Sequence, residues 1–204
     1  MEEIIMIKKA DLNGKWQSKE SETLKNPDGT VMYIKREAVF SEDSWEILIK
    51  TFMDEAAEVP LFTVRANGSY KLGEESDDVP SATCVDFENT ARYVTPNNGS
   101  MAEMLNHAAV GKVGWKVNVE QDVSKEGCFL VPSIENCPVE YDLLKIVTGE
   151  VEREELYFGD YTPEQREDMQ KASKNSKNGF EASQGICAPE NRPQTLIEFP
   201  LLRV

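Results

Sequence analysis

Hydrophobic and polar positions alternate with a period of two along most of this chain. The pattern is clearest between Val113 and Val123, where valines and one tryptophan alternate with charged and amide side chains. An alternation of this kind predicts a strand with one buried face. It predicts further strands around Trp16 and over Val31–Phe40, Trp45–Met53, Leu61–Leu72, Thr83–Val94, Val139–Val147, Glu155–Gly159 and Gln194–Arg203.

Turn-forming residues separate these segments. They cluster at 26–29 (Asn-Pro-Asp-Gly), at Ser41–Ser44, at Asn67–Gly68 and between Glu74 and Pro80. Short strands divided by turns are typical of sandwiches and barrels. Closing the sheet removes its exposed edges. We therefore expect an all-β, antiparallel β-barrel of about eight to ten strands, with one or two short helices.

Two segments depart from the period of two. Asn97–Ala109 is typical of a helix, with Met101, Met104 and Leu105 on one face, which we expect to pack on the barrel wall or to plug a mouth. Thr162–Arg192 begins with a helix-like turn and continues through a stretch rich in Ser, Asn, Lys and Gly. We expect a single domain over residues 1–204, with 162–192 as a flexible insertion or lid between the last two strands.

The two ends of the chain resemble the two ends of one barrel. Gly14 and Trp16 open the first strand, and the last strand closes on Arg203. A tryptophan can plug the end of a small barrel, and a guanidinium can lie across its indole face. We assign structural roles to these three residues, with Trp16 as the plug and Arg203 as its cover.

The chain is strongly acidic. Lys and Arg number 22 against 37 Asp and Glu, for a formal net charge of −15. This charge argues against binding to nucleic acid or to an anionic membrane surface. No apolar run approaches the ~20 residues needed to span a bilayer. The first residues lack the pattern of a signal peptide, which indicates a cytosolic protein or a mature secreted fragment.

Four scattered cysteines leave the redox state open. Cys128 and Cys137 bracket a proline-containing loop and could be bridged, with Cys84 and Cys187 either paired or free. No Cys-x-x-Cys motif is present and His107 is the single histidine, so we expect no metal site.

Two Asn-Gly-Ser sequences, at Asn67 and Asn98, match the pattern for N-glycosylation in a eukaryotic secretory pathway. Asn-Gly also suits the backbone of tight turns. We favour the turn interpretation for both.

The sequence contains no recognisable catalytic constellation. It lacks a Gly-x-Ser-x-Gly elbow and a glycine-rich phosphate loop, and the acidic residues at 74–78 do not match a calcium loop. Alternation along the strands predicts that Arg65 and Arg92 face outwards. An enzyme that uses the barrel as a reaction chamber is therefore the least favoured alternative.

Aromatic and aliphatic side chains are abundant on the predicted strands. A barrel of this size either fills with such side chains or encloses one small ligand. We expect non-catalytic binding of a small hydrophobic molecule or acyl chain, with no cofactor other than such a bound lipid. The candidate cavity lining is Trp45, Ile47, Phe62, Val64, Phe87, Tyr93 and Trp115, with Met101 and Met104 at one mouth.

Several segments together resemble a known family. The most specific is Gly114–Val123 with its Trp-x-Val-x-x-x-Gln-Asp-Val stretch. The others are Gly14–Ser18, Tyr33–Phe40, Trp45–Ile47, Val59–Phe62, Gly68–Tyr70, Tyr93–Pro96, Gly127–Cys128, Glu140–Lys145, Arg192–Pro193 and Pro200–Arg203. The chain is similar to the single-domain relatives of the adenomatosis-polyposis-coli-down-regulated proteins. The resemblance implies a lipocalin-like (calycin) barrel, and the animal members are membrane-anchored Wnt antagonists that take up the lipid of the Wnt protein.

This chain departs from the family pattern at three cysteine positions, which hold Ser21, Ala57 and Val110. We carry over the barrel and a lipophilic cavity, and not the family disulfides or the Wnt partner. An interaction module that sequesters a lipidated signalling protein is the first alternative function.

Overall fold

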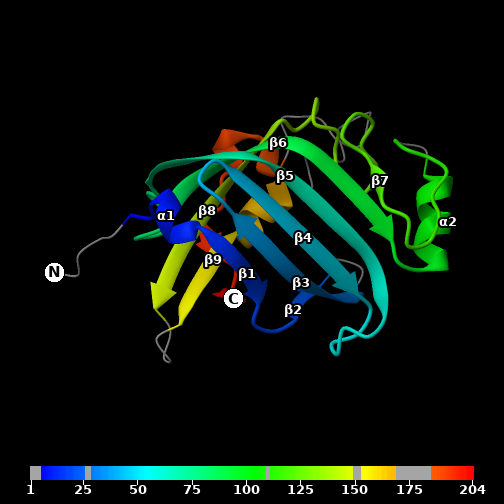
Figure 1. Cartoon of the computed structure of the whole chain (residues 1–204), viewed down its shortest axis with the longest axis horizontal. Coiled ribbons are helices and arrows are strands. Elements are labelled where there is room, and N and C mark those ends of the chain that lie inside the picture. The colour runs from blue at the N-terminus through cyan, green and yellow to red at the C-terminus, as the bar shows by residue number, and fades with distance from the viewer. Residues whose placement is uncertain (1–5, 26–28, 109–110, 149–152, 169–184) are drawn as a thin grey trace.

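Eleven antiparallel strands form one sheet in the computed structural model, which describes residues 6–25, 29–108, 111–148, 153–168 and 185–204 (Figure 1). The strands are β1 (Gly14–Ser18), β2 (Glu22–Lys25), β3 (Val31–Phe40), β4 (Ser44–Phe52), β5 (Pro60–Glu75), β6 (Thr83–Pro96), β7 (Gln121–Asp122), β8 (Val139–Thr148), β9 (Glu154–Asp160), β10 (Thr195–Leu196) and β11 (Leu201–Arg203). Helical elements are α1 (Lys9–Leu12), α2 (Gly99–His107), residues 163–168, and the 3-10 turns η1 (Gly185–Cys187) and η2 (Pro189–Asn191).

The sheet closes on itself to form a ring. Its order runs β1-β11-β9-β8-β6-β5-β4-β3, and β1 pairs with β3 as well as with β11. The first strand therefore lies between the third and the last, and hydrogen bonding continues around the whole ring. The expectation of an all-β chain built on antiparallel strands is confirmed.

One end of the ring is closed by Trp16. Its side chain is fully buried, and its indole Nε1 donates to the carbonyl of Leu12 in α1 at 2.8 Å. Arg203 pairs with Trp16 across the β1–β11 ladder, and its guanidinium carbon lies 4.2 Å from the indole centroid. The same guanidinium donates to the carbonyls of Asp11 and Asn13 and pairs with Glu154. Trp16 and Arg203 therefore lie against each other at this end of the ring.

Aromatic side chains fill the ring above this plug. Phe40 lies 5.5 Å from Tyr70, and Phe87 lies 4.6 Å from Trp45, measured between ring centroids. Leucines and valines complete a buried cluster whose members include Leu12, Ala38, Val85, Leu144, Leu156, Phe158 and Leu201. Burial of these side chains supplies the main driving force for folding.

A register shift between β5 and β6 changes which side chains point inwards. The register shifts between Asn67 and Gly68, so that Gly68 faces Asn89. A Cβ on Gly68 would lie 1.8 Å from the Glu88 carbonyl oxygen, which explains the glycine. The prediction of a turn at Asn67–Gly68 is thus wrong, because β5 continues through it.

The register shift also reverses the alternation along β6. Phe87 and Arg92 both face the interior although they differ in parity, since an extra residue is accommodated between Asn89 and Ala91. Arg92 is only 1% exposed, so the prediction that it faces outwards is wrong. Arg65 precedes the register shift on β5. Its side chain lies on the outer face and forms ion pairs with Glu46 and Glu120.

The segment with the clearest alternation is mostly not a strand. Between Val113 and Val123 only Gln121–Asp122 pairs with a neighbouring strand, and the prediction of a strand over the whole range is wrong. The valines before it are exposed, and Gly114 and Asn118 have positive φ angles of 81° and 56°.

Asn106 takes the place of a partner strand for this segment. Its Oδ1 accepts from the N–H groups of Gly114 and Trp115, and its Nδ2 donates to the Trp115 carbonyl. These bonds hold the buried Trp115 side chain against α2.

Arg92 organises the loop between β7 and β8. Its guanidinium donates to the carbonyls of Pro132, Ser133 and Cys137 and forms a 2.6 Å ion pair with Glu140. One buried cation therefore satisfies three loop carbonyls that form no strand ladder.

A disulfide joins this loop to the C-terminal part of the chain. Cys137 is bonded to Cys187 of η1 across 50 residues, while Cys84 and Cys128 are free thiols. The suggested Cys128–Cys137 bridge is wrong. Cys128 instead packs in the cluster around Trp115 and exchanges backbone hydrogen bonds with Val131.

Replacing both Cys137 and Cys187 with serine should lower the free energy of unfolding by about 2–4 kcal/mol, because the cross-link restricts the unfolded chain. Urea unfolding monitored by tryptophan fluorescence measures the change. Cys84→Ser is the matched control and should unfold like the wild type under oxidising conditions. The prediction would be contradicted if a reducing agent changed the free energy of unfolding of the wild type no more than that of the double variant.

The remaining expectations near the C-terminus are met only in part. The predicted Gln194–Arg203 strand is interrupted and forms β10 and β11 on either side of Pro200. Within the proposed 162–192 insertion, residues 169–184 lie outside the described residues. The end of that segment is anchored by Arg192, which donates to the carbonyls of Val85 and Asp142 at 2.7 Å.

Candidate functional site

The structure divides the predicted cavity residues between two hydrophobic clusters. Trp45 and Phe87 are buried in the cluster that fills the ring, and Ile47 packs against it. Trp115 and Met101 are buried in a second cluster beside α2, with Phe62 and Val64 packed against them. The nine candidates therefore do not line one common space.

The other two candidates lie at the surface. Tyr93 is stacked under the guanidinium of Arg65 at 3.9 Å on the outer face, and Met104 is 53% exposed on α2. The predicted helix over Asn97–Ala109 corresponds to α2, capped by Asn98, whose Oδ1 accepts from the N–H of Met101.

A pocket of about 660 Å³ lies at the end of the ring away from Trp16, and we call it the mouth pocket. Strands β2 and β3 form one wall, and the ends of β9 and β10 form the other. Its lining residues are Glu22, Thr23, Leu24, Ile34, Asp160, Tyr161, Thr162, Pro163, Arg166, Thr195, Leu196, Ile197, Glu198 and Phe199. Apolar and polar side chains both contribute to it.

A buried ion pair lies beside the mouth pocket, which its Glu22 member lines. Arg36 Nε donates to Glu22 Oε1 at 2.6 Å, and both side chains are about one-tenth exposed or less. The Arg36 guanidinium also lies 5.0 Å from the Phe158 ring and donates to the Phe199 carbonyl. Burial raises the pKa of Glu22 although the nearby Arg36 charge lowers it.

Asp142 lies close to this pair without contacting a cation through its carboxylate. Its Oδ1 accepts from the N–H groups of Leu143 at 2.7 Å and Gly159 at 3.0 Å. Loss of hydration raises its pKa to about 7, against the smaller opposing effects of these two bonds and of Arg36. The neighbouring Glu140 charge raises the pKa further.

This carboxyl should give the fold a pH dependence. Because its folded-state pKa is about 7 and its ordinary value is 3.8, the folded chain binds more protons than the unfolded chain between these values. The Asp142 contribution should therefore lower the free energy of unfolding as pH rises through this window, by at most about 1.4 kcal/mol per pH unit.

Asp142→Asn should remove that slope and keep both backbone bonds, since both go to Oδ1. Urea unfolding of wild type and variant across the same pH range measures the difference. Identical slopes for the two proteins would show that Asp142 does not titrate as stated.

Tyr161 lines the mouth pocket and lies near the Asp142 and Glu140 carboxyl groups. Its hydroxyl is buried and has no hydrogen-bond partner among the described residues. Burial, followed by the nearby Asp142 and Glu140 charges, raises the pKa of Tyr161. Asp160 and Arg166 form an ion pair on the same wall. An unpartnered buried hydroxyl beside a pocket is a group that a bound molecule or a water can satisfy.

Sequence reasoning missed most of the mouth pocket. Its charged residues share no motif, and the segments that supply them are about 140 residues apart in sequence, from β2 to β9. The inward position of Arg36 follows from the alternation with Ala38 and Phe40, so a charge on the buried face of β3 was the one available signal.

The chemistry available at the mouth pocket favours binding. Glu22 and Arg36 neutralise each other, and Asp142 is held by backbone N–H groups. Ionisable groups do converge inside the ring, as a reaction chamber would require, but they contact one another and the backbone. Among the described residues, no group of three or more His, Cys, Asp or Glu side chains is placed to hold a metal ion.

The described helices are all too short or too polar to cross a membrane.

Comparison with known families gives an independent result. The family model described as adenomatosis polyposis coli down-regulated 1 matches residues 1–179. The match spans the ring strands from β1 to β9 and most of the mouth pocket. The chain therefore belongs to the adenomatosis polyposis coli down-regulated 1 family.

Proposed function

We propose that this chain is a non-catalytic binding domain that takes up the apolar part of a small amphipathic molecule or acyl chain at the mouth pocket. One observation carries the proposal. At one end of the ring the Trp16 side chain is buried under Arg203, and at the other end lies a pocket lined by Leu24, Ile34 and Phe199.

The size and lining of the pocket support this function. Its volume of about 660 Å³ lies within the range of ~300–1,000 Å³ typical of small-molecule sites. Aliphatic and aromatic side chains offer contacts for a hydrocarbon segment, and three threonines with the Asp160–Arg166 pair offer contacts for a polar end. The Tyr161 hydroxyl is available to a bound polar atom.

Binding of a fluorescent fatty acid tests the proposal. Leu24→Gln should weaken binding roughly tenfold, because about 1.4 kcal/mol of apolar contact is lost. Val39→Gln, on the outer face where Val39 is 43% exposed, is the matched control and should bind like the wild type. Native mass spectrometry before and after organic extraction identifies any molecule that copurifies. The absence of binding to folded wild type, or equal binding by Leu24→Gln, would contradict the proposal.

A second candidate is an interaction module that binds the acyl chain while it is attached to a signalling protein. The family match favours it, because the animal members are Wnt antagonists. Exposed apolar side chains near the mouth pocket also favour it: Met53 is 59% and Val59 is 48% exposed in the β4–β5 turn. This turn is tied to the start of β2 by a hydrogen bond from Ser21 Oγ to the Glu55 carbonyl.

An acylated peptide and the free fatty acid distinguish the two candidates. The interaction module predicts tighter binding of the acylated peptide, and it predicts that Met53→Gln weakens the peptide complex alone. A simple carrier predicts that Met53→Gln changes neither affinity. Isothermal titration calorimetry with both ligands and both proteins gives the answer.

A further inference from the structure

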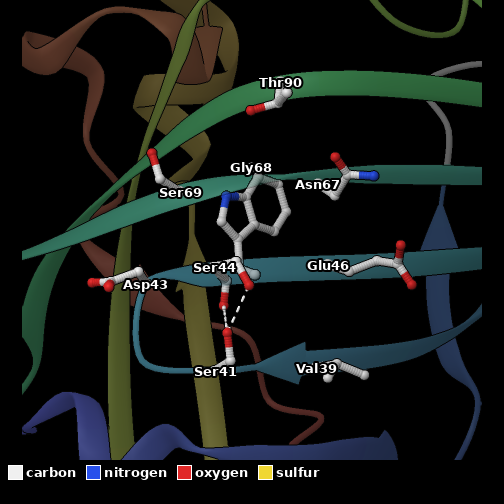
Figure 2. Close-up of a pocket in the computed structure, with 10 residues that line it drawn as sticks. Val39, Ser41, Asp43, Ser44, Glu46, Asn67, Gly68, Ser69 and Thr90 are labelled. Carbon is white, nitrogen blue, oxygen red and sulfur yellow. Dashed lines mark hydrogen bonds between the residues drawn. The ribbon is translucent and has the colours of Figure 1, made fainter.

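A second pocket lies on the outer face of the sheet, and we call it the outer groove. It shares no lining residue with the mouth pocket. Figure 2 shows it crossing β3, β4, β5 and β6. Its volume is about 520 Å³, and its lining residues are Val39, Ser41, Asp43, Ser44, Trp45, Glu46, Asn67, Gly68, Ser69 and Thr90. Most of them carry a hydroxyl, amide or carboxylate group.

No contact within the described part of the fold requires an asparagine at position 67 in this groove. The Asn-Gly pair is not a turn, because both residues lie within β5, and the bulge there requires only Gly68. Within the described part of the chain the Asn67 side chain makes no hydrogen bond. It lies at the edge of the outer groove in Figure 2, and Ser69 lies two residues further along the strand.

The second Asn-Gly-Ser sequence has a different environment. Asn98 caps α2 through its Oδ1, and its Nδ2 donates to the Pro60 carbonyl at 3.2 Å. Both polar atoms of Asn98 therefore have a partner in the fold. Asn98 is therefore explained by its role as a helix cap. Asn67 is the candidate glycan acceptor for which the fold gives no other role.

The disulfide indicates a compartment in which such a modification takes place. Cys137–Cys187 is a bond that forms and persists in oxidising environments, such as the lumen of the secretory pathway. N-glycosylation of Asn-x-Ser sequences occurs in the same environment. The disulfide and the Asn-Gly-Ser sequence are thus both consistent with passage through the secretory pathway.

We propose that Asn67 is an N-glycosylation site and that the first sugar of its glycan lies in the outer groove. The donor is a lipid-linked oligosaccharide diphosphate. The bond between sugar C1 and the diphosphate oxygen breaks and a bond from C1 to Asn67 Nδ2 forms. The amide nitrogen loses one proton, and the lipid diphosphate leaves with the bonding electron pair.

The groove has the chemistry that a sugar requires. Hydroxyl groups of Ser44, Ser69 and Thr90 can exchange hydrogen bonds with sugar hydroxyls, and the Glu46 carboxylate can accept them. The sugar's less polar face can rest on Val39, which is otherwise exposed on the sheet.

Peptide mass spectrometry of the full chain, secreted from cultured eukaryotic cells behind a standard leader, tests the site. Enzymatic removal of N-glycans in heavy-oxygen water should convert Asn67 to labelled aspartate. Asn67→Gln and Ser69→Ala should each lose the corresponding glycan, and Asn98→Gln is the matched control that should retain it. An unmodified Asn67 in the secreted wild type would overturn the proposal, whether or not Asn98 is modified.

Carboxyl footprinting tests the position of the sugar. With the glycan trimmed to its first sugar, Glu46 should react more slowly with a carbodiimide than in the fully deglycosylated chain. Glu58, in the β4–β5 turn outside the groove, should react equally in both. Equal reactivity of Glu46 would show that the sugar lies outside the groove. Neither experiment depends on ligand binding at the mouth pocket.

Discussion

Trp16→Ala should lower the free energy of unfolding by about 3–5 kcal/mol, the range for removing a fully buried large aromatic side chain. Trp16 is 0% exposed, and its removal leaves a cavity at the closed end of the ring. The Leu12 carbonyl loses its indole donor and the Arg203 guanidinium loses the ring beneath it. Urea unfolding with far-ultraviolet circular dichroism measures the change, because this signal does not rely on the deleted tryptophan.

Trp16→Phe separates the two contributions. Phenylalanine keeps an aromatic ring under Arg203 and removes the hydrogen bond to Leu12, so it should lose less stability than alanine. Neither variant should change fatty-acid affinity while the protein is folded, since Trp16 does not line the mouth pocket. A Trp16→Ala protein as stable as the wild type would show that the plug does not hold the ring closed.

Arg92→Met should cost a similar amount, roughly 3–5 kcal/mol, because it removes a buried cation on which a partly buried carboxylate and three loop carbonyls depend. Glu140 would lose its cation, and the carbonyls of Pro132, Ser133 and Cys137 would lose the guanidinium hydrogen bonds, although the Ser133 carbonyl keeps the Cys137 N–H. Hydrogen exchange should increase between residues 124 and 137 more than in β3 or β4. Denaturant unfolding together with peptide-resolved exchange measures both effects.

Adding Glu140→Gln to Arg92→Met should recover part of the lost stability, because the uncompensated charge is then absent. Lys71→Met is the matched control, since its ion pair with Glu88 is exposed, and it should leave the unfolding midpoint unchanged. If Arg92→Met lowers the unfolding midpoint no more than Lys71→Met does, the β7–β8 loop does not depend on Arg92 for its stability.

The strands could be predicted from the sequence where the backbone is regular. The boundaries of β3, β4 and β8 agree with the alternation to within a residue, because each strand has one face on the core and one towards solvent. The contact between Trp16 and Arg203 could also be inferred from the sequence, since a guanidinium and an indole have complementary chemistry.

The misses have local causes. An extra residue at the β6 bulge reversed the side-chain faces after Asn89, so Arg92 was placed on the wrong side. Around Trp115 the alternating valines are exposed, and a side chain from α2 supplies the hydrogen bonds that a strand would supply. Alternation alone does not contain either piece of information, because both depend on contacts with residues far away or in another element.

The mouth pocket was the least predictable part. Its walls come from the two ends of the chain, and its ionisable residues are ordinary strand and loop residues in sequence. The ring order, in which β1 and β11 lie between β3 and β9, brings Glu22 of β2 near Asp160 at the end of β9. Seven of the nine candidate cavity residues belong to the two hydrophobic clusters or pack against them, and this pattern does not locate an opening.

The position of β1 between β3 and β11 has a consequence for synthesis. Residues 14–18 are synthesised long before one of their two partners, residues 201–203. Until then β1 and β9 each present an unpaired edge, a state that invites pairing with another chain. The closing contact is also among the most distant in sequence, and contacts of this kind slow folding. A nascent chain should therefore depend on chaperones until residues 201–203 are available for pairing, and its misfolded products should be edge-to-edge oligomers.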